Sequence, residues 1–319
     1  MKKKVLITGG FGYLGGRIAI YLAREAGYNV VLTSRNIKLP PSWLPEAEIF
    51  PYDLLDTTSL SNIIKEVEVI VHLAGMNEND CKLYPVEATI VNTLGTKNIL
   101  NLAINNGVKK FIYFSTAHVY GSNLIGHITE EVAPNPINPY AISHFKAEDY
   151  VLNANEQKKI IGIVFRLSNG FGVPAYPEVN SWNLLVNNIC RQIAESNKIV
   201  LRTNGMQKRD FITLEDVSRG VHHFLELSVS DSNVGLFNFG GNSPSMSIME
   251  LTMKIASSCN NILNFYPEIS TFTDINAQLV NEFIYDSTKL KNTGFCWMSN
   301  VDSEIERTLM MTFKYFRLI

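Results

Sequence analysis

Two short stretches place hydroxyl and imidazole side chains at a spacing that suits proton transfer. Ser115-Thr116 closes an apolar run typical of a strand, and Tyr140 and His144 lie four residues apart at the start of a predicted helix. Side chains four apart project from one helical face. A tyrosine hydroxyl beside the Thr116 hydroxyl could exchange a proton with a substrate while a bound cofactor exchanges a hydride. A tyrosine that only packs on the sheet is the alternative, and the spacing alone leaves it open.

A glycine-rich turn near the start of the chain predicts the cofactor. The apolar run Val5 to Ile7 reads as a buried strand, and Thr8-Gly9-Gly10-x-Gly12-x-x-Gly15 follows it directly, before a helical pattern. Glycines allow an unusual φ and a close approach to a pyrophosphate, while the N–H groups at a helix start favour an anion. This arrangement indicates a dinucleotide site, with a plain glycine-rich turn as the alternative reading.

The end of the second predicted strand bears on which dinucleotide binds. The strand Asn29 to Thr33 closes in Ser34-Arg35, where NAD sites usually carry a carboxylate for the adenosine ribose. An arginine there accommodates a 2′-phosphate, so the pattern favours NADP and leaves NAD open. Arg35 as a solvated loop charge is the alternative. Asp53 and Leu54 follow a short strand and are expected beside the adenine.

Bulk composition excludes several other classes of protein. The chain has 319 residues, 46% hydrophobic and 18% charged, with a formal net charge of −2, which argues against broad attraction to nucleic acid or an anionic membrane. No segment approaches the ~20 apolar residues of a membrane helix. Cys81, Cys190, Cys259 and Cys296 are far apart and are read as reduced core cysteines. The adjacent His222 and His223 face different ways on a helix, so no metal site is assigned. The expected compartment is the cytoplasm.

The order of elements predicts an α/β fold. Buried strands at Val69 to Leu73, Phe111 to Phe114 and Ile161 to Leu167 alternate with helical stretches, of which one runs from Pro85 to Asn106. This alternation is typical of a Rossmann-type, doubly wound parallel sheet. We expect residues 1–168 to form this dinucleotide-binding domain. Residues 169–319 are expected to form mainly a small substrate-binding lobe, with segments that return to the first domain and a helix that begins across Asn180 to Leu185.

Taken together, these motifs resemble the extended short-chain dehydrogenase/reductase family, in particular its nucleotide-sugar epimerase/dehydratase branch. The matches run in order along the chain: Thr8-Gly9-x-x-Gly12-x-x-Gly15, His72-Leu73-Ala74-Gly75, Asn92-x-x-Gly95-Thr96, Ser115-Thr116 before Val119-Tyr120-Gly121, Asn138-Pro139-Tyr140-Ala141-x-Ser143, Arg166-x-x-Asn169-x-x-Gly172, Arg209-Asp210-Phe211 with Asp216-Val217, and Asn238-Phe239-Gly240.

The resemblance implies a role for each site residue. Thr116 would bond the reacting sugar oxygen, Tyr140 would be the acid/base, and His144 would stand beside it. The implied cofactor contacts are Gly9, Phe11, Gly12, Tyr13, Leu14, Gly15, Ser34, Arg35, Asp53, Leu54, Leu73, Ala74, Gly75, Asn92, Tyr140 and His144. The implied substrate contacts are Thr116, His118, Asn169, Asn183, Leu184 and Arg209. A structural ion pair of Arg209 with Asp210 or Glu215 is the alternative for that residue. The family usually forms homodimers through the helices around 85–106 and after Tyr140.

Three departures from the family pattern narrow the chemistry. His144 stands where the family has a lysine, so a fixed positive charge beside Tyr140 is missing, because imidazole is mostly neutral at cytoplasmic pH. Ala117-His118 replaces the Asp-Glu pair of the 4,6-dehydratases, which disfavours dehydration. Asn281-Glu282 replaces an arginine-containing stretch, so one diphosphate contact is missing.

The expected function is therefore an NAD(P)-dependent epimerase or oxidoreductase that moves a hydride to or from a sugar carbon, C4, of a nucleotide-activated sugar. One alternative is an NADPH-dependent 4-keto-sugar reductase. Another is a catalytically weak dinucleotide-binding regulatory protein, which the histidine at 144 supports and the intact Thr116 and Tyr140 oppose.

Overall fold

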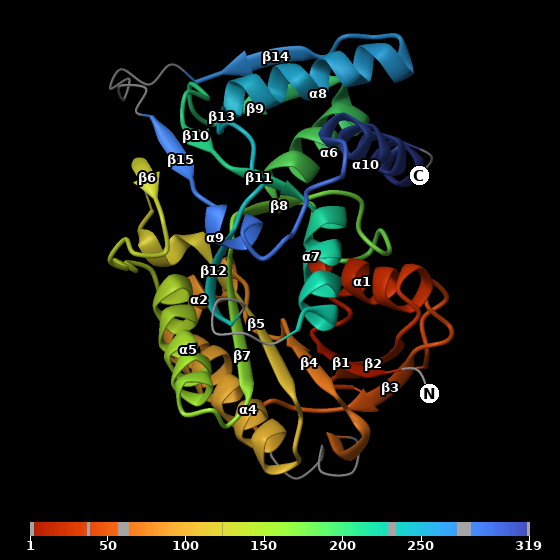
Figure 1. The fold of residues 1–319 in the computed structure, drawn as a ribbon. Helices are drawn as coiled ribbons and strands as arrows, with labels where there is room; N and C mark the ends of the chain where they lie inside the picture. Colours follow the sequence, from red (N-terminus) through yellow and green to blue (C-terminus); the bar gives the residue numbers. More distant parts are fainter. Residues whose placement is uncertain are drawn as a thin grey trace.

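A sheet of seven parallel strands forms the centre of the computed structural model, which describes residues 3–36, 39–56, 64–122, 124–228, 234–272 and 282–317. The strand order is β12-β7-β5-β4-β1-β2-β3 (Figure 1). These strands span Lys4–Thr8 (β1), Asn29–Ser34 (β2), Glu48–Pro51 (β3), Val69–His72 (β4), Lys110–Thr116 (β5), Ile161–Leu167 (β7) and Gly235–Phe239 (β12). Every pairing between them is parallel, which confirms the predicted Rossmann-type sheet.

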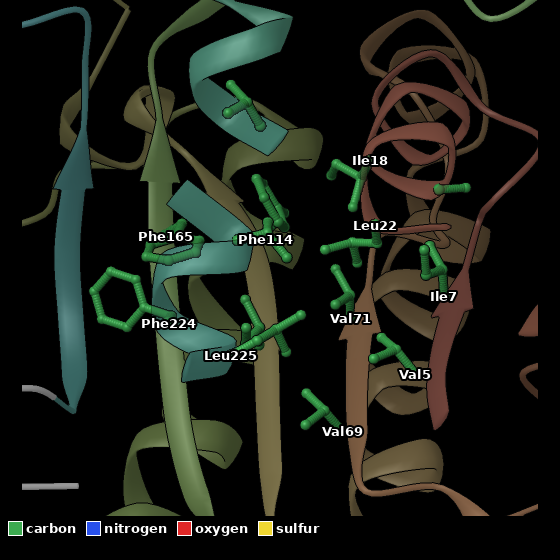
Figure 2. Close-up of a cluster of buried hydrophobic side chains, with 14 of the residues drawn as sticks. Val5, Ile7, Ile18, Leu22, Val69, Val71, Phe114, Phe165, Phe224 and Leu225 are labelled. Atoms are coloured by element: carbon green, nitrogen blue, oxygen red, sulfur yellow. The ribbon is translucent and has the colours of Figure 1, made fainter. Parts of the chain in front are cut away.

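Both faces of the sheet are covered because successive side chains of a strand point to opposite sides. On one face Val5 and Ile7 pack with helices α1 (Tyr13–Ile20) and α7 (Leu214–Glu226). On the other face Leu6 packs with residues of α4 (Gly95–Asn105) and α5 (Pro139–Glu156). Figure 2 shows the first cluster, in which Ile18 and Leu22 lie beside Val71, and Phe224 lies beside Phe165.

Within the described residues, the helical segments contain two π-helical stretches. Tyr21–Glu25 (η1) extends α1, and Gly27, with φ of +74°, ends this segment as expected. The predicted helix from Pro85 consists of α3 (Pro85–Ala88), the π-helical η3 (Thr89–Leu94) and α4. Shorter elements are η2 (Ile64–Glu66), α2 (Glu78–Leu83), η4 (Ala117–Tyr120) and β6 (Gly126–Ile128).

The second half of the chain builds a separate apolar cluster above the sheet (Figure 1). The further elements of this half are β8 (Asn169–Phe171), α6 (Leu185–Ser196), β9 (Lys198–Leu201), β10 (Lys208–Arg209), β11 (Phe211–Thr213), β13 (Met246–Ser247), α8 (Ile248–Leu263), β14 (Glu268–Thr271), β15 (Phe283–Tyr285), α9 (Thr288–Lys291) and α10 (Val301–Phe316). The cluster draws on α6, α8 and α10, whereas β12 and α7 return to the sheet. Helix α6 begins at Leu185, so the expectation that Asn180 to Leu184 are already helical is wrong.

No helix within the described ranges is long and apolar enough to cross a membrane. All four cysteines are free thiols, and Cys81, Cys190 and Cys259 are buried, as expected of core cysteines. Cys296 is exposed, so for this residue the expectation of a core position is wrong.

The aromatic centre of the core gives a stability prediction. Phe165 is fully buried, and its ring centroid lies 4.8–6.4 Å from those of four other phenylalanines. Replacing it by alanine leaves a cavity that these rings cannot fill, so Phe165→Ala should lower the free energy of unfolding by about 3–5 kcal/mol in denaturant titrations. The matched control Leu39→Ala removes a side chain that is 85% exposed and should change this energy by less than about 0.5 kcal/mol. Equal effects of the two variants would contradict this packing.

Candidate active site

The glycine turn between β1 and α1 is compressed to a degree that only glycine allows. Gly9 has φ of +70°, and a Cβ on it would lie 2.9 Å from the Ala74 backbone nitrogen. A Cβ on Gly15 would lie 2.3 Å from the Gly9 carbonyl oxygen. Gly12 is the N-cap residue of helix α1 and offers no side-chain cap, which leaves the first N–H groups of the helix available to an anion. The turn therefore fits the pyrophosphate of a dinucleotide.

Beside this turn lies a cavity of about 600 Å³ at the carboxyl ends of the strands. Its lining includes the following predicted cofactor residues: Gly9, Phe11, Gly12, Ser34, Arg35, Asp53, Leu54, Ala74 and Gly75. Tyr52, Asp80 and Tyr84 also line it. The last two were missed because they lie beyond β4, in a stretch without a recognisable motif.

Two other predicted cofactor residues, Tyr13 and Asn92, make hydrogen bonds within the protein. The Tyr13 hydroxyl donates to the Gly172 carbonyl at 2.7 Å and so points towards the second half of the chain. The Asn92 side chain is buried, accepts from the Met76 backbone N–H at 2.7 Å and donates to the Ser143 hydroxyl at 3.0 Å.

Leu14 packs against the core cluster that includes α1. The Leu73 backbone N–H donates to the Thr8 hydroxyl at 3.2 Å. For Tyr13, Leu14, Leu73 and Asn92, direct contact with the cofactor stays a prediction.

The three predicted catalytic residues come together at the carboxyl end of β5. Thr116 is the last residue of β5, while Tyr140 and His144 lie in the first turns of α5, which covers β5 and β7. Asn138 caps this helix by accepting from the Ala141 N–H at 2.8 Å. The Tyr140 and His144 rings meet edge to face, with centroids 4.4 Å apart. The helical spacing thus brings both side chains to one place.

The phenol of Tyr140 holds its proton tightly. Burial raises the pKa of Tyr140 well above its ordinary value, Glu78 and Cys81 raise it further, and a hydrogen bond with Thr116 opposes them. At neutral pH the group is therefore a proton donor. Glu78, which lies at the start of α2, is a site residue that the sequence analysis missed.

His144 contacts a tyrosine of the central sheet. Its Nδ1 atom lies 2.8 Å from the hydroxyl oxygen of Tyr113 in β5. Burial lowers the pKa of His144 to about 4, His118 lowers it as well, and the Phe114 carbonyl opposes them. The imidazole is therefore neutral at neutral pH and gives Tyr140 no positive charge. Tyr113 was missed, although the period of two along β5 puts it on the face that α5 covers.

A second, narrow cavity brings three of the predicted substrate residues together. His118, Asn169 and Arg209 line it, together with Ala117, Ser122, Leu124, Ser168, Gln207, Lys208, Asp210, Phe283 and Tyr285. The Asn169 amide donates to the Asp210 carbonyl at 2.9 Å, and β8 pairs with β11, which places Arg209 next to Asn169. At about 20 Å³ the cavity holds roughly one water, so its side chains must move apart to admit a sugar.

Two other predicted substrate residues lie elsewhere. Asn183 and Leu184 are exposed just before α6 and are not part of the cavity lining. Their contact with substrate stays a prediction. Asn281 lies outside the described residues, and the neighbouring Glu282 accepts from the Gly126 N–H through its carbonyl at 2.7 Å.

Arg209 is not held in the ion pair that was considered as its alternative role. The Asp210 carboxylate accepts from the Ser168 hydroxyl and from the Gly241 N–H, and Glu215 pairs with Arg307 at 3.0 Å. Among the residues described, Arg209 donates instead to the Gln207 side chain at 3.1 Å. Its guanidinium and Lys208 give the second cavity a basic wall, which suits an anionic ligand.

The sequence is similar to a family of known proteins. A family model described as "NAD dependent epimerase/dehydratase family" matches residues 5–240. The dTDP-D-glucose 4,6-dehydratase of Mus musculus is 28% identical over 265 residues, which cover 79% of this chain and 72% of that protein.

Two solved structures share the fold. RMD from Pseudomonas aeruginosa, complexed with NADPH, matches with a TM-score of 0.78 at 22% identity and covers 98% of this chain and 100% of its own. The UDP-N-acetylglucosamine 4-epimerase from Methanobrevibacter ruminantium M1, in complex with UDP-N-acetylmuramic acid, matches with a TM-score of 0.83 at 22% identity. That match covers 98% of this chain and 99% of the epimerase.

The neutral imidazole of His144 predicts a pH dependence of stability. Its pKa of about 4 in the folded chain lies below the ordinary value of 6.5, so the unfolded chain binds more protons between these pH values. Stability should therefore fall as the pH drops from 6.5 towards 4. Relative to His144→Gln, which cannot titrate, the wild type should lose about 1.4 kcal/mol of unfolding free energy per pH unit in this window. Denaturant titrations at several pH values measure this difference, and a difference independent of pH would contradict a neutral His144.

Proposed function

This chain belongs to the NAD dependent epimerase/dehydratase family, and on that premise we propose that it moves a hydride to or from C4 of a nucleotide-activated sugar. The observation that carries the proposal is the Thr116-Tyr140 pair at the carboxyl end of β5. Ala117 and His118, directly after Thr116, line the second cavity, which we call the basic cavity because Arg209 and Lys208 form one of its walls. The dinucleotide cavity lies beside the glycine turn that follows β1. Acid/base, cofactor and anionic substrate would thus meet at one edge of the sheet.

The residues of the chain supply the proton chemistry. A nicotinamide, when bound, supplies or accepts the hydride. In the reductive direction Tyr140 donates its phenolic proton to the carbonyl oxygen at C4 as the new C–H bond forms, and the oxygen becomes a hydroxyl. Thr116 orients that oxygen through its own hydroxyl. An epimerase performs the oxidation first and then the reduction on the opposite face of the sugar.

The basic cavity supports a nucleotide sugar as the substrate class. Arg209 offers planar donors to a diphosphate, Asn169 lies beside it, and Lys208 adds a second cation. The 4-epimerase from Methanobrevibacter ruminantium M1, which shares the fold, was solved with a UDP-sugar. We extend this substrate class to the present chain, without naming the base or the sugar.

Two observations favour the reductase as a second candidate. Tyr140 keeps its proton because burial, Glu78 and Cys81 raise its pKa and the adjacent His144 is uncharged, so giving a proton is easier than taking one. Arg35 lines the adenosine end of the dinucleotide cavity, and no carboxylate follows β2, which suits NADPH. Dehydration fits less well, because Ala117-His118 offers no carboxylate pair, although the mouse relative bears the name of a 4,6-dehydratase.

The homodimer is part of the same proposal. Large apolar side chains are exposed along α2, α3 and η3, namely Leu83, Tyr84, Val86, Ile90 and Leu94. An exposed apolar stripe of this kind is typical of an interface, and these elements include the stretch that the resemblance pairs between subunits.

Tyr140→Phe is the direct test of the proposed chemistry. The variant keeps the ring against His144 and removes the phenolic proton, so kcat should fall about 10²–10⁴-fold while cofactor affinity is retained. Turnover is followed by the absorbance of reduced nicotinamide and by product analysis over a panel of nucleotide sugars and 4-keto sugars. Tyr266→Phe, at an exposed position, is the matched control. Unchanged turnover in Tyr140→Phe would assign the proton transfer elsewhere, and a wild type that binds cofactor without any turnover would favour the regulatory protein.

The preference for NADP is tested at Arg35. Arg35→Ser removes the cation that would bond the 2′-phosphate, so the Kd for NADPH should rise about 10–100-fold while that for NADH stays unchanged. Fluorescence titration of both cofactors measures this. Arg24→Ser, which removes an arginine paired with Glu46 outside the cavity, is the control. Equal losses for both cofactors would contradict a 2′-phosphate contact.

A further inference from the structure

We propose that Tyr113 is a positioning residue that holds His144 as an uncharged N–H donor, so that the site works without a fixed cation beside Tyr140. The expected change in KM rests on the proposed function. The charge and the tautomer of His144 rest on the geometry around the ring.

Tyr113 is clamped between two imidazole rings inside the molecule. It is 3% exposed and lies in β5 on the face that α5 covers. Its ring stacks on His144 with centroids 5.9 Å apart, and on His72 with centroids 5.7 Å apart. The stack fixes the direction of the Tyr113 hydroxyl, which lies 2.8 Å from His144 Nδ1.

The hydrogen bonds around His72 settle its protonation state. The Thr8 hydroxyl oxygen accepts from the backbone N–H groups of Leu73 and Ala74, both at 3.2 Å, so its own proton goes to His72 Nδ1 at 2.6 Å. His72 therefore carries its proton on Nε2 and donates it to the Thr96 hydroxyl at 2.9 Å. Burial, the larger cause, and the nearby His144 lower the pKa of His72 to about 3, which agrees with a neutral ring.

The hydrogen bonds of Thr96 and Tyr113 bear on the position of the ring proton of His144. Thr96 donates its proton to the Asn92 carbonyl at 2.6 Å and accepts from His72, so its oxygen keeps one lone pair. Burial raises the pKa of Tyr113, and a hydrogen bond with Thr96 opposes this rise. His144 Nδ1 lies 2.8 Å from the Tyr113 hydroxyl, and in a hydrogen bond between these two groups the phenol is the better donor and the imidazole nitrogen the better acceptor. Nδ1 therefore accepts, and the ring proton of His144 lies on Nε2.

The surroundings of His144 keep this ring uncharged. The titratable groups that face it are Tyr113 in β5, His72 in β4, His118 in η4 and Tyr140 in α5. None of these four carries a negative charge at neutral pH that would stabilise an imidazolium. The Phe114 carbonyl does favour the charged ring, but burial lowers the pKa of His144 by more than this carbonyl raises it. A neutral imidazole with its proton on Nε2 can donate a hydrogen bond to a hydroxyl group, such as one of a ribose, without carrying a charge.

The state of the ring is read directly by ¹⁵N NMR of the histidine side chains in the full chain, with His144 assigned from the spectrum of His144→Gln. We expect a neutral ring with its proton on Nε2 from pH 7 to pH 5 in the wild type. A proton on Nδ1, or an imidazolium at pH 7, would overturn the proposal. Because this experiment needs no substrate, its result stands apart from success or failure of the proposed function.

The role of the hydroxyl is tested by Tyr113→Phe, which keeps the stacked ring and removes the bond to Nδ1. We expect the His144 spectrum to change to a mixture of both tautomers, and the KM for the reduced cofactor to rise about tenfold with a smaller change in kcat. In a His144→Ala background the same substitution should change KM less than about twofold.

Tyr120→Phe is the matched control, because it removes another buried tyrosine hydroxyl, bonded to Asn238 at 2.6 Å, and should leave the His144 spectrum unchanged. An unchanged His144 spectrum in Tyr113→Phe, or equal effects of Tyr113→Phe with and without His144, would overturn the positioning role.

Discussion

The parallel register of the central sheet is the constraint on which the site depends. Because all seven strands run the same way, the carboxyl ends of β1, β2, β4 and β5 reach one edge of the sheet. The glycine turn follows β1 there, Arg35 follows β2, and His72 and Thr116 are the last residues of β4 and β5. The apolar side chains of both faces keep these strands in register by packing on α1 and α7 on one side and on α4 and α5 on the other. Packing of the core thus determines where the candidate site residues lie at the carboxyl ends of the strands.

The electrostatics of this edge differ from those of a site with a fixed cation. His72 and His144 are both neutral because burial costs their charged forms more than the surrounding hydroxyl and carbonyl groups return. Tyr140 also holds its proton, because burial raises its pKa and Glu78 and Cys81 raise it further. Positive charge is found instead in the basic cavity, on Arg209 and Lys208, where it would face the substrate anion and not the acid/base. In the function that we propose, the group that would donate a proton is therefore separate from the groups that would attract the ligand.

Much of this arrangement follows from local sequence rules. The glycine turn, the alternation of strands and helices and the four-residue spacing of Tyr140 and His144 are short-range patterns, and each predicted its part of the fold. The contact between Tyr113 and His144 was not predictable, because it depends on how α5 is placed against β5.

The same holds in the second half of the chain. Arg209 lies beside Asn169 because β8 and β11 pair. Helix α6 begins later than expected because Leu184 has an extended backbone, with ψ of 145°, and its N–H donates to the Ser181 carbonyl at 3.0 Å. The return of β12 to the sheet edge beside β7 likewise joins residues far apart in the chain. Such contacts depend on tertiary packing and leave no periodic trace in the sequence.

Hydride transfer at C4 is the central claim, and an isotope experiment tests it most directly. Reduced cofactor that carries deuterium at the transferable position of the nicotinamide is mixed with the protein and nucleotide 4-keto sugars, and the products are examined by NMR. We expect deuterium on C4 of the product sugar, since both an epimerase and a reductase must reduce a 4-keto group. Deuterium at another carbon, or a cofactor that binds and keeps its deuterium with every sugar, would contradict it.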